Sequence, residues 1–208
     1  MLPKIANKLT RHHTPYDLRA VNFLIIDDNP HMRFLVRQLL HVFGVRNIRE
    51  ADDGAHALKI QKIFHPDIAI CDWYMSPLNG IEFTRIIRTS SDIRNPYLPI
   101  IMLTGYTELH LVEQARDAGI DEFLSKPISA HMLYDRILSI IEKRRPFIKT
   151  ATYHGPDRRR HHDETPYNGV ERRLNSMTST HEAVPTNDLF GNVALSAQSH
   201  INRRPSLT

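Results

Sequence analysis

Short strand-like segments alternate with longer helix-like segments along residues 21–145. The clearest strand-like segments, at 68–71 and 100–103, are unbroken apolar runs, which are typical of strands buried on both faces. The helix-like segments carry apolar residues three or four positions apart, as in 32–43. We therefore predict five strands, each followed by a helix. The strands are expected near residues 21–26, 46–51, 67–72, 100–104 and 122–125.

This alternation favours one fold class. A helix that follows each strand carries the chain back across the sheet by a right-handed crossover, so the next strand runs parallel to the last. Residues 21–145 are therefore predicted to form one α/β domain, a doubly wound five-stranded parallel sheet with five helices on its two faces. A segment of about 125 residues is long enough to bury an adequate core.

The flanks differ in character from this domain. Residues 1–20 contain 4 Lys and Arg against 1 Asp, and they show no sustained apolar period, so we expect a flexible basic arm. Residues 146–208 contain 8 Lys and Arg against 6 Asp and Glu, with scattered apolar residues, and most of this segment is predicted to be a disordered tail. The domain itself is nearly neutral, with 15 basic against 16 acidic residues, so the net charge of +4 describes the flanks.

Composition narrows the protein class. No apolar run approaches the roughly 20 residues of a membrane-spanning helix, and the start lacks the apolar centre of a secretory signal. The one cysteine, Cys71, cannot form an intramolecular disulfide, which fits a reducing compartment. We expect a soluble, cytoplasmic protein.

Polar residues stand where four of the predicted strands end. Asp27 and Asp28 follow the first strand, Asp72 ends the third, Thr104 ends the fourth and Lys126 follows the fifth. Because the carboxyl ends of parallel strands meet at one edge of the sheet, these side chains should converge. Asp72 lies at a central strand, where a side chain is held firmly and still faces the crevice.

Three carboxylates in one crevice repel each other unless a positive charge is present. Mg²⁺ is bound by one or two carboxylates together with waters and phosphoryl oxygens, so these residues favour a Mg²⁺ site. Lys126 adds a cationic group for an anion, and Thr104 adds a hydroxyl donor. The set predicts a phosphoryl group carried on Asp72, with its carboxylate as the nucleophile.

Six motifs follow one another along the domain: Phe23-Leu24-Ile25-Ile26-Asp27-Asp28, Glu50-Ala51-Asp52-Asp53-Gly54, Cys71-Asp72-Trp73-Tyr74-Met75, Asn79-Gly80, Leu103-Thr104-Gly105 and Ser125-Lys126-Pro127. In order and in spacing they resemble the motifs of a receiver domain, the phospho-accepting module of two-component response regulators. The resemblance is nearest to the single-domain chemotaxis type, covers residues 21–145 and neither flank, and implies the flavodoxin-like strand order 2-1-3-4-5.

The resemblance implies a role for each site residue. Asp72 is expected to be the phospho-acceptor and a ligand of Mg²⁺, together with Asp28, with Asp27 acting mostly through water and the backbone carbonyl of Tyr74 completing the protein ligands. Lys126 is expected to pair with the phosphoryl group. Thr104 would follow that group by hydrogen bonding, and Phe123 matches the switch aromatic whose ring turns inward when the threonine moves.

The sequence departs from the family pattern in the loop after Asp72. Receivers usually have proline directly after the methionine, whereas here Ser76 intervenes before Pro77. Bulky rings also stand two positions beyond Asp72, at Tyr74, and two beyond Thr104, at Tyr106. Such rings should hinder an attacking water, so we predict slow loss of the phosphoryl group.

The resulting hypothesis is a response regulator without a folded output domain and without enzymatic activity beyond its own phosphoryl transfer and slow autodephosphorylation. Its expected partners are a histidine kinase or phosphotransfer protein and a downstream protein, with a homodimer through the fourth helix, fifth strand and fifth helix as a further option. A membrane span is not expected, and nucleic acid is an unlikely partner. The alternatives are a nucleic-acid-binding or scaffold protein that acts through its Arg-rich tail and is gated by the receiver, and a receiver that is never phosphorylated.

The tail contains an internal repeat. The unit Gly155-Pro156-Asp157-Arg158-Arg159 recurs as Gly169-Val170-Glu171-Arg172-Arg173. These units are interpretable as solubilising charge or as a segment that orders on a partner. Nucleic-acid binding is less favoured, because few aromatic side chains are present there on which bases could stack.

Overall fold

A computed structural model describes residues 16–105, 109–150, 153–158 and 180–182. Five helices and five parallel strands alternate through the domain, and three further short strands follow it. In chain order the elements are β1 Asn22–Ile26, α1 Pro30–Val42, β2 Asn47–Ala51, α2 Gly54–Phe64, β3 Ile68–Asp72, α3 Gly80–Thr89, β4 Ile100–Thr104, α4 Leu109–Ala118, β5 Glu122–Ser125, α5 Ala130–Glu142, β6 Phe147–Lys149, β7 His154–Pro156 and β8 Thr180–Glu182.

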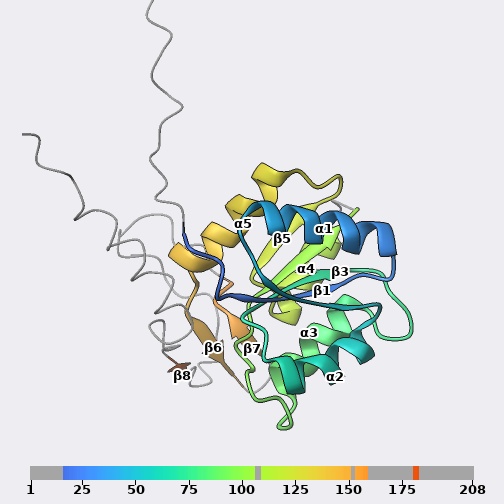
Figure 1. Ribbon diagram of the computed structural model, residues 1–208. Helices are drawn as coiled ribbons and strands as arrows, with labels where there is room; N and C mark the ends of the chain where they lie inside the picture. The colour runs from blue at the N-terminus through green and yellow to red at the C-terminus, as the bar shows by residue number, and fades with distance from the viewer. Residues whose placement is uncertain (1–15, 106–108, 151–152, 159–179, 183–208) are drawn as a thin grey trace, which may run out of the picture.

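The main sheet has the order β2-β1-β3-β4-β5, and all its neighbouring strands are parallel. The predicted strand order, the five strands and the five helices are therefore confirmed. Figure 1 shows α1 and α5 on one face of this sheet and α2 and α3 on the other. Because the chain order reverses between β1 and β3, their carboxyl ends flank the crevice in which ligands of such folds bind.

Two apolar layers hold the sheet between its helices. Alternate residues of β1 point to opposite faces, so Leu24 and Ile26 pack into one layer while Phe23 and Ile25 pack into the other. The first layer includes Ala57 of α2, Phe83 and Ile87 of α3 and Ala115 of α4, and the second includes Val36 and Leu40 of α1 and Leu133 and Ile137 of α5. Both β3 and β4 are buried along their whole length, as their unbroken apolar runs predicted.

The packed body extends beyond residues 21–145 at both ends. Leu18 is 1% exposed within the core, and the Tyr16 hydroxyl donates to Glu142 at the end of α5. On the other side, Phe147 is fully buried and β6 pairs with β7. The sequence pattern missed these segments because their few buried residues, such as Leu18 and Phe147, recur with no helix or strand period. The remainder of the predicted arm and tail lies outside the described residues.

No helix among the described residues combines the length and the apolar character that a transmembrane segment requires.

Candidate functional site

Three carboxylates meet at the carboxyl edge of the sheet. Asp27 and Asp28 follow β1, and Asp72 ends the adjacent β3; one oxygen from each lies within 4.8 Å of the others. Asp27 is 1% exposed and Asp72 is 8% exposed, whereas Asp28 is exposed. The predicted convergence of these residues is thus present in the structure. The parallel register, which places Ile26 beside Cys71, produces it.

Lys126 supplies the positive charge at this edge. Its Nζ lies 2.9 Å from Asp72 Oδ1 and 3.3 Å from Asp27 Oδ2, and its backbone N–H donates to the Thr104 carbonyl at 2.8 Å. Burial alone would lower the pKa of Lys126. Its hydrogen bond and charge interaction with Asp72, together with Asp27, nevertheless raise that pKa above its ordinary value. Lys126 is therefore held as a cation.

Asp27 is the most deeply buried of the three carboxylates. Its Oδ1 accepts the backbone N–H of Asn29 at 2.8 Å, so the start of α1 orients it. The Asn29 side chain in turn caps α1 by accepting from the backbone N–H groups of His31 and Met32. Burial, reinforced by the charge of Asp72, raises the pKa of Asp27, although Asn29 and Lys126 oppose this shift. A cation bound at this site would therefore stabilise the ionised form of Asp27, which burial disfavours.

The loop after Asp72 is held close to the strand. Gly80 begins α3, and a Cβ atom at this position would collide with the Asp72 carbonyl, so no side chain fits there. The Gly80 N–H donates to the Trp73 carbonyl at 3.1 Å, and Asn79 forms a capping box with Glu82. Trp73 is 5% exposed, whereas Tyr74 is 52% exposed. The loop therefore buries the Trp73 ring and exposes the Tyr74 ring to solvent.

Thr104 and Phe123 lie on the neighbouring strands. Thr104 ends β4 with 5% of its surface exposed and pairs in register with Ser125, directly before Lys126. Phe123 in β5 is half-buried and packs against the layer that contains α4. Both residues occupy the places expected of them, while the roles inferred for them in switching stay predictions. Tyr106 lies outside the described residues.

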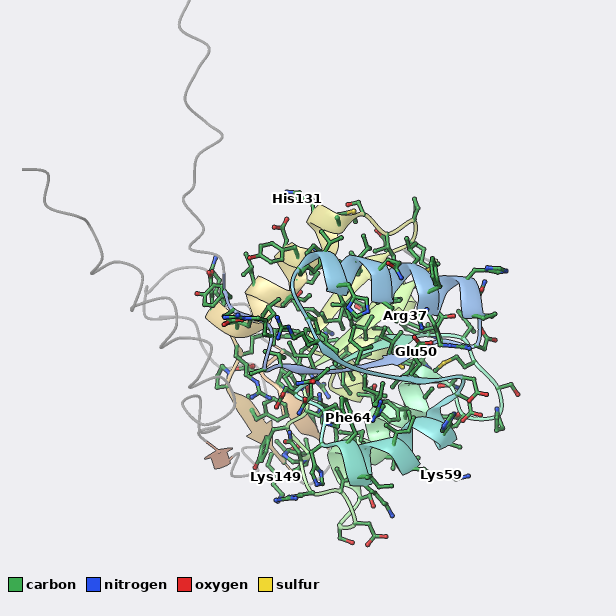
Figure 2. The ribbon with its side chains drawn as sticks, in the orientation of Figure 1. Arg37, Glu50, Lys59, Phe64, His131 and Lys149 are labelled. Atoms are coloured by element: carbon green, nitrogen blue, oxygen red, sulfur yellow. The ribbon has the colours of Figure 1, made fainter. Side chains whose placement is uncertain are left out.

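One group of site residues was missed by the sequence interpretation. Arg33 of α1 donates from Nη1 to the carbonyls of Asp27 at 2.7 Å and Asp28 at 3.3 Å, and its Nε contacts Glu50 at 3.2 Å. Arg37, one turn later, contacts the other Glu50 oxygen at 2.5 Å. Figure 2 shows Arg37 of α1 close to Glu50 of β2. The sequence does carry a signal for this group, because Arg33 and Arg37 stand four residues apart on one helix face and Glu50 lies on the adjacent edge strand.

The donor set fits a hard divalent cation. Of the three carboxylates, Asp72 and Asp27 share one lysine, Lys126, so acidic side chains outnumber the cation that contacts them directly. Oxygen ligands from one or two carboxylates, with room on an exposed side for waters, are what Mg²⁺ prefers. Asp28 provides that exposed side, so the residues present are those that would hold the ion.

Comparison with known proteins gives one consistent result. Residues 23–138 match the family model of the response regulator receiver domain. The chemotaxis protein CheY-3 of Vibrio cholerae is 32% identical over 125 residues, which are 60% of this chain and 95% of the relative. The chemotaxis protein CheY of Pseudomonas aeruginosa is 33% identical over 123 residues, 59% of this chain and 98% of the relative. The solved structure of Vibrio cholerae CheY4 superposes with a TM-score of 0.53 at 29% identity, covering 58% of this chain and 98% of that one.

Proposed function

Because this chain belongs to the family of response regulator receiver domains, we propose that it accepts a phosphoryl group from a histidine kinase or phosphotransfer protein onto Asp72. One observation carries the proposal. A single cation, Lys126, contacts both Asp72 and the buried Asp27 at the sheet edge, where the three carboxylates converge. A purely structural ion pair would have balanced charges, whereas this arrangement leaves negative charge to be neutralised by a ligand.

The transfer uses residues of this chain in distinct roles. An Asp72 carboxylate oxygen attacks the phosphorus of a donor phosphohistidine, a P–O bond forms, the P–N bond breaks, and the imidazole leaves with its electron pair. Lys126 stabilises the negative charge of the transferred group, and Thr104 donates a hydrogen bond to it. Asp27, Asp28, Asp72 and the Tyr74 carbonyl would hold Mg²⁺, which when bound supplies positive charge against the phosphoryl oxygens.

The output proposed for the phosphorylated form is altered protein binding. Phosphorylation would change the surface made by α4, β5 and α5, with Thr104 and Phe123 as the elements that change position. That surface would bind a downstream protein or a second copy of the chain. The protein would catalyse only its own phosphorylation and a slow autodephosphorylation, and it would act in the cytoplasm.

Trp73 makes the proposal directly testable, because it is the only tryptophan of the chain and directly follows Asp72. Addition of Mg²⁺ and beryllofluoride, an acyl-phosphate mimic, should change Trp73 fluorescence, and radiolabelled acetyl phosphate should label the protein. Asp72→Asn should abolish both responses. Asp92→Asn, in an exposed loop before β4, should leave them intact. Unchanged fluorescence and no label in the wild type would refute the proposal.

A further inference from the structure

The end of the domain opposite the carboxylates holds a second polar cluster, around Arg88 at the end of α3. This guanidinium is 2% exposed and donates to the Gly119, Pro96 and Leu98 carbonyls, and to Asp121 Oδ2 at 2.9 Å. Phe147 of β6 stacks against it, with the guanidinium carbon 5.1 Å from the ring centroid. Figure 1 shows β6 and β7 here, far from the start of α1.

The first Gly-x-acid-Arg-Arg unit is bound to this cluster. We call the surface formed by Arg88, Asp117 and Gly119 the seat. His154 Nδ1 lies 2.7 Å from the Arg88 carbonyl, and Gly155 lies so close to Gly119 that a Cβ atom on Gly155 would stand 2.8 Å from the Gly119 Cα. A side chain at Gly155 therefore cannot be accommodated without moving backbone.

Residues on either side of Gly155 complete the docking. The Arg158 guanidinium lies 3.9 Å from the Tyr153 ring centroid, and its Nη1 lies 3.2 Å from Asp117 Oδ1 at the end of α4. The backbone N–H of Asp157 donates to the Pro146 carbonyl at 2.7 Å. Three residues of the first unit therefore make the docking contacts, namely Tyr153, Gly155 and Arg158.

The second unit preserves these three residues. Tyr167, Gly169 and Arg172 stand fourteen positions after Tyr153, Gly155 and Arg158 (167 − 153 = 14). The acidic position is also kept, as Glu171 in place of Asp157. The imidazole is not kept, because Asn168 stands where the first unit has His154, the residue that contacts the Arg88 carbonyl.

The chain also returns to the seat after the second unit. β8 pairs with β6 in antiparallel register, with Ile148 beside His181. The chain on either side of the second unit is therefore anchored on β6, through β7 before it and β8 after it. The second unit begins 18 positions after the end of β6, and the first begins 4 positions after it (167 − 149 and 153 − 149). The lower entropy cost of closing the shorter loop then favours binding of the first unit over the second by only about tenfold.

We propose that the seat is a peptide-binding site for a Tyr-x-Gly-x-acid-Arg segment, and that the two units of this chain occupy it one at a time. The first unit is the main occupant, because of its shorter loop and His154. The second takes the seat when the first is released, which frees β7. The family match ends at residue 138, and relatives complete their domain without these residues, so the domain should stay folded when the seat is empty.

The test follows the Gly119 amide and the Arg88 Nε–H by two-dimensional NMR in the full chain. Gly155→Ala should displace the first unit and move both signals to a second position, because the second unit now fills the seat. Gly155→Ala combined with Gly169→Ala should move them to a third position, that of the empty seat. Gly169→Ala alone is the matched control and should leave the wild-type signals unchanged.

Addition of a peptide spanning residues 165–175 to the double variant should shift both signals toward the second position. Identical spectra of the single and double variants, or no response to the peptide, would overturn the proposal. A second position that depends on protein concentration would assign the exchange to a neighbouring chain and overturn its intrachain form. Should the glycine variants fail to fold, Arg158→Ala and Arg158→Ala with Arg172→Ala, which remove the contact with Asp117, give the same comparison.

Discussion

Both ends of the sheet hold buried charged side chains, but the two ends differ in how those charges are paired and exposed. At the amino end, Arg88 and Asp121 form a 2.9 Å pair, and Arg88 also donates to three backbone carbonyls while Asp121 Oδ2 also accepts the Ile100 N–H. At the carboxyl end, Lys126 faces Asp72 and Asp27 and remains partly exposed. The Arg88–Asp121 pair is buried and its charges match, although Arg144 and Arg145 add positive charge beside it, whereas the carboxyl-end cluster is negative and partly open to water.

This difference distinguishes an ion pair that stabilises the fold from a charge cluster that is able to bind a ligand. A buried ion pair persists only when its members are satisfied, and the guanidinium of Arg88 achieves this with hydrogen bonds from Nε and from both terminal nitrogens. The carboxyl end leaves charge unsatisfied within a rigid frame, where a ligand can restore the balance. Perturbed pKa values occur at both ends, so a pKa shift alone does not identify the functional one.

The largest expected effect concerns the Arg88–Asp121 pair at the amino end. Arg88→Met should leave Asp121 buried without its partner and lower the free energy of unfolding by about 3–5 kcal/mol, measured by urea denaturation. Arg85→Met, on the exposed side of the same helix, is the control and should change it by less than about 0.5 kcal/mol. Equal losses in both variants would contradict the structural role assigned to Arg88.

At the carboxyl end, Lys126→Ala should separate cation binding from phosphoryl acceptance. Removal of a positive charge 2.9 Å from Asp72 and 3.3 Å from Asp27 should tighten Mg²⁺ binding by about tenfold, followed by Trp73 fluorescence. Labelling by acetyl phosphate should fall at the same time, because the phosphoryl group loses its cationic partner. Weaker Mg²⁺ binding in this variant would show that Lys126 serves mainly to hold the fold.

A smaller effect is expected from Asp27→Asn. Burial raises the pKa of Asp27, so its contribution to stability is present at acid pH and is lost as the pH rises through the folded-state pKa. Without metal at pH 7, the variant should therefore melt about 2–4 °C above the wild type, and the difference should shrink on acidification. With saturating Mg²⁺ the order should reverse. A lower melting temperature without metal would mean that the Lys126 contact outweighs the burial of Asp27.

The smallest effect concerns the rate at which the proposed phosphoryl group is lost. Tyr74 is 52% exposed and lies two positions after Asp72, so Tyr74→Asn should open a path for water. The lifetime of the aspartyl phosphate should then shorten by roughly threefold, which is less than the tenfold change that corresponds to about 1.4 kcal/mol of activation free energy. The decay of the radiolabel measures it. Tyr74→Phe keeps the ring and should keep the lifetime, whereas an unchanged lifetime in Tyr74→Asn would exclude hindrance by the ring.

Much of the carboxyl end could be predicted from the sequence, and much of the amino end could not. Asp72 and Thr104 directly end apolar runs, so strand order alone brings them together. Arg88 gives no such signal, because an arginine in an amphipathic helix is ordinarily exposed and its partner Asp121 lies 33 residues away. Phe147 and Ile148 form only a short apolar pair, and the burial of Phe147 depends on Arg88 and Arg144, which only the folded chain brings together.

The contact between Gly80 and the Asp72 carbonyl also limits how this sequence can evolve. Every replacement of Gly80 adds a Cβ atom, so even alanine would have to push the loop away from the Asp72 backbone. Neighbouring positions such as Tyr74 and Ser76 point outward and carry no such restriction. Related sequences can therefore tune the chemistry by varying the loop's exposed side chains, while the backbone crossing beneath them stays fixed.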